Sequence, residues 1–316
     1  MLSDSAERSA GLRHVSVSIA ICTRNRANQL RACLDAISRI ASSVPWELVV
    51  VDNGSSDDTR AVLERFARTA PFPVTVVHEP VAGLGRARNA GWSAATGEFI
   101  AFTDDDCYVE PDHPDRVRDL FLQPEVGFGG GRITLHDPAD YPITIQLLAD
   151  RVVVPPRAIV RAGLIKGANM AFRRTVLGQI GGFDPSFGAG TKFCAEDMDA
   201  LTRASFAGWH GLYDPNLSVA HHHRRKAADV QKLRRIYSIG RGAFYMKLML
   251  RRDSRLKACK HLFWEYWPAL LGRRMNWRLS FYVLEGAIGY AGFRLRAAIL
   301  GRDRPRLATA QQPGPK

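Results

Sequence analysis

The sequence lacks the cysteine pattern of a disulfide scaffold or of a zinc-binding domain. Its five cysteines form no CxxC pair, and their number is odd. Cysteines without such pairing are typical of proteins in a reducing compartment. An N-terminal extension, residues 1–14, also lacks the apolar core that a signal peptide needs. These two absences predict a cytoplasmic protein.

The sequence also lacks a run of about 20 apolar residues, the length needed to cross a bilayer. The most apolar stretch of the C-terminal part is interrupted by Glu265, Arg273, Arg274, Arg278, Glu285 and Arg294. Hydrophobic residues make up 46% and charged residues 24% of the chain, an ordinary composition for a globular protein. A polytopic membrane protein and a disordered chain are therefore excluded. The 316 residues allow one large domain with an appendage.

Acidic residues are scarce after residue 220. From His221 to the end, 22 Lys and Arg face 5 Asp and Glu, a net charge of +17, which leaves −4 of the total +13 for residues 1–220. This asymmetry indicates an anionic partner for the C-terminal segment, either nucleic acid or an acidic lipid leaflet. Because no recognised nucleic-acid-binding module occurs, we expect no nucleic-acid partner.

Residues 15–135 alternate apolar runs with amphipathic segments. The runs VSVSIAICT, WELVVVDNG, VTVVHEP and EFIAFTDDD are each followed by a helical pattern, and VGFGGGRITL closes the series. This βαβα order predicts an α/β fold of the Rossmann-like type, a mostly parallel sheet with helices on both faces. Ligands of such sheets bind at the carboxyl ends of the strands, so we expect the site there.

Three consecutive aspartates follow the apolar run 99–102. In an extended chain Asp104 and Asp106 point to one face and Asp105 to the other. Two such carboxylates can hold a hard divalent cation, Mg²⁺ or Mn²⁺, and leave coordination positions for a diphosphate. The alternative is a solvated acidic loop, which is disfavoured because unpaired like charges repel.

A second acidic pair, Glu196 and Asp197, opens a predicted helix after a glycine-rich loop. The positive end of the helix dipole keeps carboxylates ionised, and an ionised carboxylate can accept a proton from a hydroxyl. Acidic residues in a first helical turn are also common without any function. Asp52 is similarly ambiguous, since a carboxylate after a strand can accept an N–H from a pyrimidine or shape the following turn.

Several segments stand in the order and at the intervals found in one enzyme family. They are AICTRNR (20–26), VVVDNGSSDDT (49–59), ARNAG (87–91), TGEFIAFTDDDC (96–107), and the later GGFDPSF and AEDMDA. Over roughly residues 15–220 the chain resembles the family 2 glycosyltransferases. The resemblance implies an inverting hexosyltransferase with the A-type glycosyltransferase fold. It also implies a nucleotide diphosphate sugar as donor, UDP by default, and a hydroxyl acceptor.

The resemblance assigns roles to individual residues. It assigns to the nucleotide-sugar site Thr23, Arg24, Asn25, Asp52, Asn53, Arg88, Asn89, Asp104 and Asp105. It assigns the divalent cation to Asp104 and Asp106, with His223 of the run SVAHHH as the candidate third ligand. Alternation puts His221 on the same side as His223, and either could instead be a polar strand end. The catalytic base is assigned to Asp197, with Glu196 beside it.

The C-terminal region combines arginines with large aromatic residues, among them Trp264, Trp267, Trp277 and Tyr282. Such residues suit a membrane interface, with rings at headgroup level and cations on anionic lipid. We therefore expect a peripheral protein at the inner face of the cell membrane. The alternative is a helical subdomain packed on the catalytic part or in a homodimer.

The expected organisation has five parts. Residues 1–14 form the N-terminal extension, 15–135 the nucleotide-sugar-binding half, 136–223 the acceptor-binding and catalytic half, 224–302 the basic helical region, and 303–316 a disordered tail. A glycan or lipid-linked acceptor in cell-envelope polysaccharide synthesis fits this arrangement. The rival functions are a nucleotidyltransferase, disfavoured because Thr23–Arg26 lacks glycines, and a non-catalytic membrane or nucleic-acid-binding protein.

Overall fold

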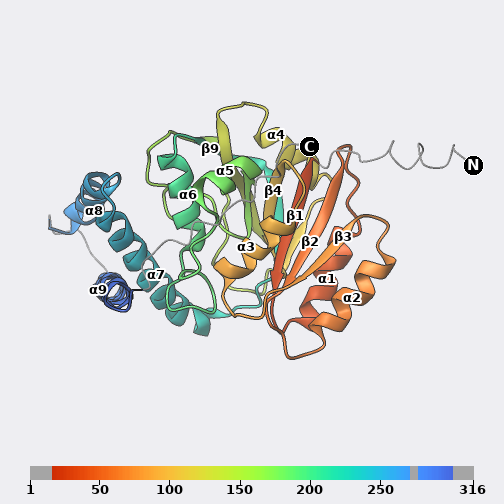
Figure 1. The fold of residues 1–316 in the computed structure, drawn as a ribbon, viewed down its shortest axis with the longest axis horizontal. Coiled ribbons are helices and arrows are strands. Elements are labelled where there is room, and N and C mark those ends of the chain that lie inside the picture. Colours follow the sequence, from red (N-terminus) through yellow and green to blue (C-terminus); the bar gives the residue numbers. More distant parts are fainter. Residues whose placement is uncertain (1–15, 271–276, 302–316) are drawn as a thin grey trace, which may run out of the picture.

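The computed structural model describes residues 16–270 and 277–301 of the chain. The predicted N-terminal extension, 1–14, and the predicted disordered tail, 303–316, lie outside the described residues. The strands of the described residues form one nine-stranded sheet, and three long helices follow it at one side (Figure 1).

The first half of the sheet is parallel, as the βαβα pattern predicts. Its strands lie in the order β3-β2-β1-β4 and alternate along the chain with helices. The strands are β1 (Val17–Thr23), β2 (Trp46–Asp52), β3 (Val74–His78) and β4 (Phe99–Asp104), and the helices are α1 (Ala27–Ile37), α2 (Thr59–Thr69) and α3 (Leu84–Ala94).

Alternate residues of β1 show that both faces of this half are covered. Ile19 and Ile21 belong to a hydrophobic cluster with α1, α2 and the later helix α4 (His113–Leu120). Ala20, between them, belongs to a second cluster with α5 (Arg174–Ile180) and α6 (Glu196–Phe206). Burial on both faces explains why these strands are continuously apolar rather than alternating.

The register of the parallel strands brings polar residues to one level. Thr23 at the end of β1 lies opposite Asp52 at the end of β2, and Cys22 lies opposite Asp104 at the end of β4. The carboxyl ends of the strands therefore form a common edge, which is where ligands of open α/β sheets bind.

The second half of the sheet is mixed, which departs from the expectation of a mostly parallel sheet. Its strands are β5 (Cys107–Val109), β6 (Val126–Leu135), β7 (Val152–Val154), β8 (Asn169–Arg173) and β9 (His210–His221). β8 occupies the edge of β4 and runs antiparallel to both β4 and β6, while β9 pairs in parallel with β6. The run VGFGGGRITL forms β6, which therefore pairs with β8 and is not adjacent to β4. Its glycines permit this, because a Cβ at Gly130 would lie 2.3 Å from the carbonyl oxygen of Asn169.

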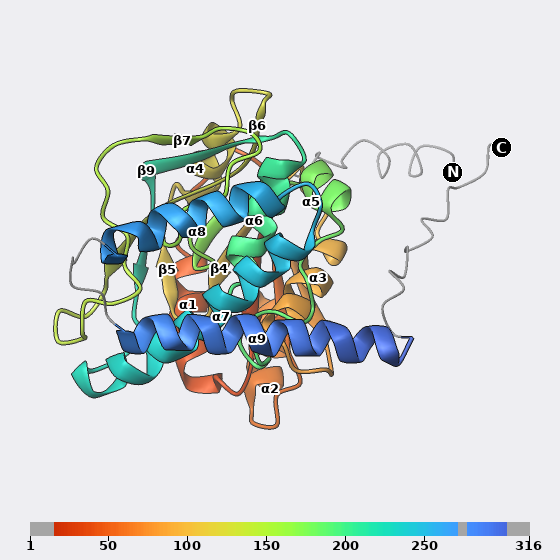
Figure 2. The same cartoon turned by 90° about the vertical axis from the view of Figure 1, so that its left-hand side faces the viewer.

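The basic C-terminal region forms α7 (Val230–Leu250), α8 (Arg255–Leu270) and α9 (Trp277–Ile299). Figures 1 and 2 show α8 and α9 on the outside of the molecule, with α7 between them and the sheet. No described helix is long and apolar enough to cross a membrane.

Helix α7 packs tightly on the segment that precedes α6. A Cβ at Gly240 would lie 1.7 Å from the carbonyl oxygen of Cys194, so only glycine allows this approach. Phe187 and Phe193 share a buried cluster with Phe244 of α7 and Tyr290 of α9. The C-terminal helices therefore complete the hydrophobic core around the residues that lead into Glu196 and Asp197.

A buried ion network reinforces this contact. Lys247 of α7 places its Nζ 2.6 Å from a carboxylate oxygen of Asp184 and 2.6 Å from one of Asp199. Arg203 pairs with the other oxygen of Asp199 at 2.8 Å. Although burial acts in the opposite direction, Lys247 lowers the pKa of Asp184 to about 2. Both carboxylates are thus charged and neutralised by a cation, as buried charges require.

Candidate active site

A cavity of about 750 Å³ lies at the carboxyl edge of the sheet. One side is formed by the ends of β1 and β4, including Thr23 and Asp104, and the first residues of α6 form another side. Residues of α7 and Leu279 of α9 complete the wall. The cavity therefore brings together the two acidic motifs that lie about 90 residues apart in the sequence.

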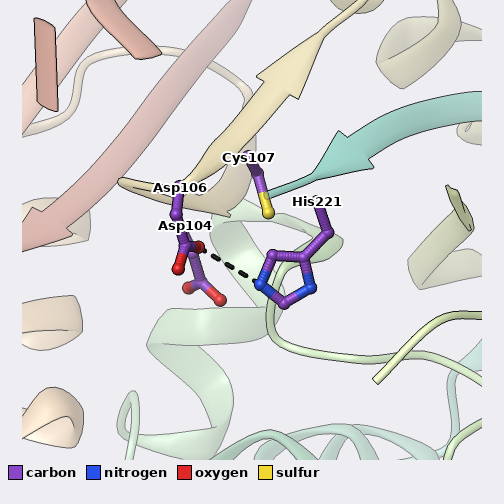
Figure 3. Close-up of side chains that lie close together, drawn as sticks. All are labelled: Asp104, Asp106, Cys107 and His221. Atoms are coloured by element: carbon purple, nitrogen blue, oxygen red, sulfur yellow. Dashed lines mark ion pairs between the residues drawn. The ribbon is translucent and has the colours of Figure 1, made fainter. Parts of the chain in front are cut away.

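The aspartate motif does not simply continue β4, since residues 105 and 106 form a turn into β5. Asp104 and Asp106 nevertheless lie together, and His221 joins them because β5 pairs with β9 in a register that opposes Cys107 to His221 (Figure 3). One ligand atom from each of these residues lies within 4.8 Å of the others. The Nε2 atom of His221 is 3.2 Å from Oδ1 of Asp106.

These residues fit a hard divalent cation. The two carboxylates are the ligand type that Mg²⁺ and Mn²⁺ prefer, and the imidazole nitrogen is a further donor beside them. Although burial opposes it, the hydrogen bond with His221 lowers the pKa of Asp106. Burial raises the pKa of the Cys107 thiol well above its usual value, so this residue stays protonated and is a poor ligand.

His223, the histidine selected from the sequence, lies elsewhere. Its Nδ1 is 3.8 Å from Oδ2 of Asp140 and accepts a hydrogen bond from the backbone N–H of Arg225. The side chain is buried beside the ring of His221 and does not line the cavity. The geometry therefore favours His221, and not His223, as the histidine that could bind a metal together with Asp104 and Asp106.

We predict that His221→Gln and His223→Gln separate these two candidates. His221→Gln should raise the Mn²⁺ concentration for half-maximal activity about tenfold or more, since losing even a supporting contact of a metal site costs about 10–100-fold in affinity. His223→Gln should change it less than about twofold. Metal titrations of both variants, with melting temperatures alongside, make the comparison. If His223→Gln instead raises this Mn²⁺ concentration more than His221→Gln does, His223 is the metal ligand.

Asp105, the middle residue of the motif, interacts with β1. Its Oδ2 accepts a hydrogen bond of 2.6 Å from the hydroxyl of Thr23. Burial raises the pKa of Asp105 to about 6. Both residues line the cavity, so they form a polar patch between the ends of β1 and β4.

Arg88 connects the two acidic motifs. This buried side chain lies on α3, and its Nη1 donates to Oε1 of Glu196 at 2.6 Å. Its Nη2 lies 3.5 Å from Asp104 and donates to the carbonyl oxygen of Gly167 at 3.2 Å. Glu196 is therefore engaged in an ion pair with Arg88.

Asp197 has no such cation at hydrogen-bond distance among the described residues. Its carboxylate accepts backbone N–H bonds from Gly167 at 3.0 Å and Met198 at 2.7 Å. Burial and then the neighbouring Glu196 raise the pKa of Asp197 above its ordinary value. A fixed carboxylate with a raised pKa at a cavity wall suits proton abstraction.

The raised pKa of Asp197 predicts a shifted pH profile. A base must be ionised, so activity should fall as the pH drops through the pKa of Asp197. Because that pKa is raised, the acidic limb should lie above the 3.8 of an ordinary aspartate. The measurement is kcat against pH at saturating donor and metal. An acidic limb below pH 4 in a protein that remains folded would contradict the assignment.

The other sequence-selected residues divide into two groups. Arg24 and Asn53 line the cavity, but Asn53 also holds the loop before α3 through Glu79, Val81 and Gly83. Three residues do not line it and make structural bonds instead: Asn25 with Ser56, Asp52 with Ser55 and His78, and Asn89 with Trp92 and Phe183.

Several cations of the cavity wall are not among the residues predicted from the sequence. They are Arg26, Lys166, Arg225, Arg234 and Arg241. Arg26 lies 3.8 Å from Asp106, and Lys166 donates to the carbonyl oxygen of Ile145. The excess of basic residues after residue 220 indicates an anionic partner for this segment. It does not predict that Arg234 and Arg241 lie near the end of β4, about 130 residues earlier in the sequence.

Solved structures share this architecture. The mannosyltransferase PcManGT of Pyrobaculum calidifontis, in complex with GDP-Man and Mn²⁺, aligns over 95% of this chain and 87% of its own with a TM-score of 0.60 and 21% identity. S. aureus TarS 1–349, in complex with UDP-GlcNAc, covers 77% of this chain and 69% of its own with a TM-score of 0.59 and 15% identity. These similarities establish the A-type glycosyltransferase fold.

The sequence comparisons agree with the fold. The pre-mycofactocin glycosyltransferase of Mycobacterium tuberculosis is 27% identical over 245 residues, which are 75% of this chain and 47% of that relative. The chain thus spans less than half of that relative's length. The family model described as glycosyl transferase family 2 matches residues 18–180, more than half of the chain. This protein therefore belongs to glycosyl transferase family 2.

Proposed function

We propose that the protein transfers a hexose from a nucleoside diphosphate sugar to a hydroxyl acceptor with inversion at the anomeric carbon. The observation that carries the proposal is that Asp104, Asp106 and His221 line the same cavity as Asp197. Such an arrangement can bind a diphosphate at one end and activate a hydroxyl at the other.

Asp104, Asp106 and His221 would hold a divalent cation, Mg²⁺ or Mn²⁺. When bound, this cation neutralises the charge that grows on the departing diphosphate. Thr23, Asp105 and Arg24 supply hydrogen-bonding groups for the nucleoside part of the donor. Arg88 holds Glu196 away from the acceptor by its ion pair, which leaves Asp197 to accept the proton from the attacking hydroxyl.

The reaction balances as a single displacement. The acceptor oxygen forms a bond to the anomeric carbon while the bond from that carbon to the diphosphate oxygen breaks, and the acceptor proton moves to Asp197. The nucleoside diphosphate leaves. We propose UDP-sugars as the first donors to test, with GDP- and TDP-sugars after them, and an acceptor used in cell-envelope glycan synthesis.

A donor screen tests this proposal. The purified full chain is incubated with UDP-, GDP- and TDP-linked hexoses, with Mn²⁺ or with EDTA, and free nucleotide is measured. Slow hydrolysis should appear with one nucleotide class and require the metal, because water can replace the acceptor. Release at equal rates in EDTA, or release from no donor, would reject the proposed chemistry.

We also propose that the outer helices attach the protein to an anionic membrane surface. On α9 the exposed large residues follow helical spacing along one face: Trp277, Phe281, Leu284, Ile288, Leu295 and Ile299, each more than half exposed. On α8, Leu256 and Trp264 are 83% and 60% exposed. Exposed apolar and aromatic side chains on basic helices suit the interface of a bilayer with anionic lipid.

This attachment predicts salt-sensitive binding to anionic vesicles. Each Lys or Arg near such a leaflet contributes about 1 kcal/mol, and salt screens this over roughly 8 Å. Trp277→Ser with Phe281→Ser should reduce sedimentation with phosphatidylserine vesicles several-fold without lowering the melting temperature, since both side chains are exposed. Removal of the whole region is a poor test, because α7 and α9 complete the core.

The matched control replaces two exposed apolar residues on another part of the surface, Leu122→Ser with Val153→Ser, which are 72% and 61% exposed in the wild type. The control should sediment like the wild type. If the wild-type protein sediments equally with neutral and with anionic vesicles at every salt concentration, the electrostatic contribution is rejected. If it sediments with neither kind of vesicle, membrane attachment is rejected.

A further inference from the structure

Carboxylates line only part of the cavity wall, where Arg26 and Arg88 lie among them. The carboxylates come from the end of β4 and the start of α6, including Asp104, Asp106 and Asp197. The α7 wall contributes Arg234 and Arg241 and no carboxylate. Since a donor diphosphate with its cation belongs beside Asp104 and Asp106, the α7 wall offers positive charge to a second anionic group.

The two arginines lie on one face of α7. They are seven residues apart, which is two turns of helix, and Tyr237 and Ser238 lie between them on the same face. All four line the cavity. Among the described residues, no carboxylate lies within ion-pair distance of Arg234. Arginine is well suited to phosphate because its planar group donates several hydrogen bonds in fixed directions.

The cavity wall also meets the apolar surface of α9. Leu279 lines the cavity, and the neighbouring positions Trp277 and Phe281 are 73% and 64% exposed. Figure 2 shows α9 running across the outer face of the molecule beside α7. A ligand that reaches from Arg234 past Leu279 therefore passes from a basic wall to an exposed apolar helix.

We infer that the acceptor is an anionic amphiphile: a saccharide linked through phosphate or diphosphate to an apolar chain. Arg234 and Arg241 bind the phosphate, the saccharide hydroxyl lies at Asp197, and the apolar chain leaves along α9. This inference rests on the proposed function and adds the chemical class of the acceptor. The proton of that hydroxyl goes to Asp197, and the nucleoside diphosphate remains the leaving group.

The test is calorimetric titration of the full chain saturated with Mn²⁺ and the nucleoside diphosphate identified by the donor screen. The probes are farnesyl diphosphate, farnesol and inorganic pyrophosphate. Farnesyl diphosphate should bind the loaded protein at least about tenfold more tightly than either other probe, because only it offers both an anion and an apolar chain. Arg234→Gln with Arg241→Gln should weaken its binding about tenfold or more, the scale for lost hydrogen bonds to a charged group.

The matched control removes the same charge from α7 and its C-terminal end outside the cavity, by Lys232→Gln with Arg252→Gln, two exposed residues that do not line it. This control should keep the affinity for farnesyl diphosphate within about twofold. Equal weakening by the control would indicate non-specific attraction and overturn the inference. The single variant Arg234→Gln, at an exposed position, provides the same comparison if the double variant does not fold.

The remaining outcomes separate the inference from the proposed function. If Arg234→Gln with Arg241→Gln weakens nucleotide binding instead, these arginines serve the donor and the inference fails. Pyrophosphate binding as tightly as farnesyl diphosphate would overturn the lipid part, and farnesol binding as tightly would overturn the phosphate part. A wild-type protein that binds no nucleotide with Mn²⁺ would instead reject the proposed function.

Discussion

Asp197→Asn should lower kcat by about 10²–10⁴, the usual contribution of a positioned general base. The amide keeps the size of the side chain, but its single oxygen can accept only one of the two backbone N–H bonds, which reach Oδ2 from Gly167 and Oδ1 from Met198. We therefore expect a small loss of stability and a nearly unchanged donor affinity. The measurements are kcat and KM for the donor at saturating Mn²⁺, with nucleotide affinity from calorimetry. The acidic limb of the pH profile should also disappear from the residual activity.

Glu196→Gln is the paired control for this prediction. Glu196 pairs with Arg88 at 2.6 Å, so its neutralisation removes an ion pair and frees Arg88 to move toward Asp104. We expect a weaker donor affinity and a smaller loss in kcat than in Asp197→Asn. If Asp197→Asn turns over normally while Glu196→Gln is inactive, the base is Glu196.

Asp106→Ala should abolish the effect of metal on nucleotide binding. The variant loses a carboxylate that contacts His221 at 3.2 Å and Arg26 at 3.8 Å, and losing a ligand should cost more than the 10–100-fold that loss of a supporting contact costs. Nucleotide titrations with and without Mn²⁺ should give equal affinities in the variant. Asp106 lies in the turn between β4 and β5 and belongs to neither hydrophobic cluster of the sheet, so the melting temperature should stay close to that of the wild type.

Asp58→Ala is a suitable control, because this exposed aspartate precedes α2 and does not line the cavity. It should keep full metal dependence. An Asp106→Ala protein that stays folded and still binds nucleotide more tightly with Mn²⁺ would remove Asp106 from the metal site.

The sequence contains enough information to predict the parallel half of the sheet and its strand ends. Continuous apolar runs such as Leu48–Val51 are buried on both faces, which is why their periodicity identifies them. The alternation at Asp104, Asp105 and Asp106 predicts that the first and the third lie together, although the chain turns there. These features depend on local pattern, which a single sequence carries.

Other parts of the site depend on contacts between distant segments. The choice between His221 and His223 follows from the pairing of β5 with β9, in which Cys107 lies opposite His221. A shift of one residue in that register would send different side chains to the site. The position of Arg234 depends likewise on the contact of Gly240 with Cys194. Neither pairing has a local signature.

The most direct test of the account is a crystal structure of the protein with Mn²⁺ and a nucleoside diphosphate, with the metal located by its anomalous scattering. We predict one Mn²⁺ between the diphosphate and the carboxylates of Asp104 and Asp106, with His221 beside it and Asp197 across the cavity. A second group with metal-binding geometry, Asp137, Asp140 and His222, gives the clear alternative among the described residues. Mn²⁺ at that group alone, with no metal at Asp104 and Asp106, would contradict the account.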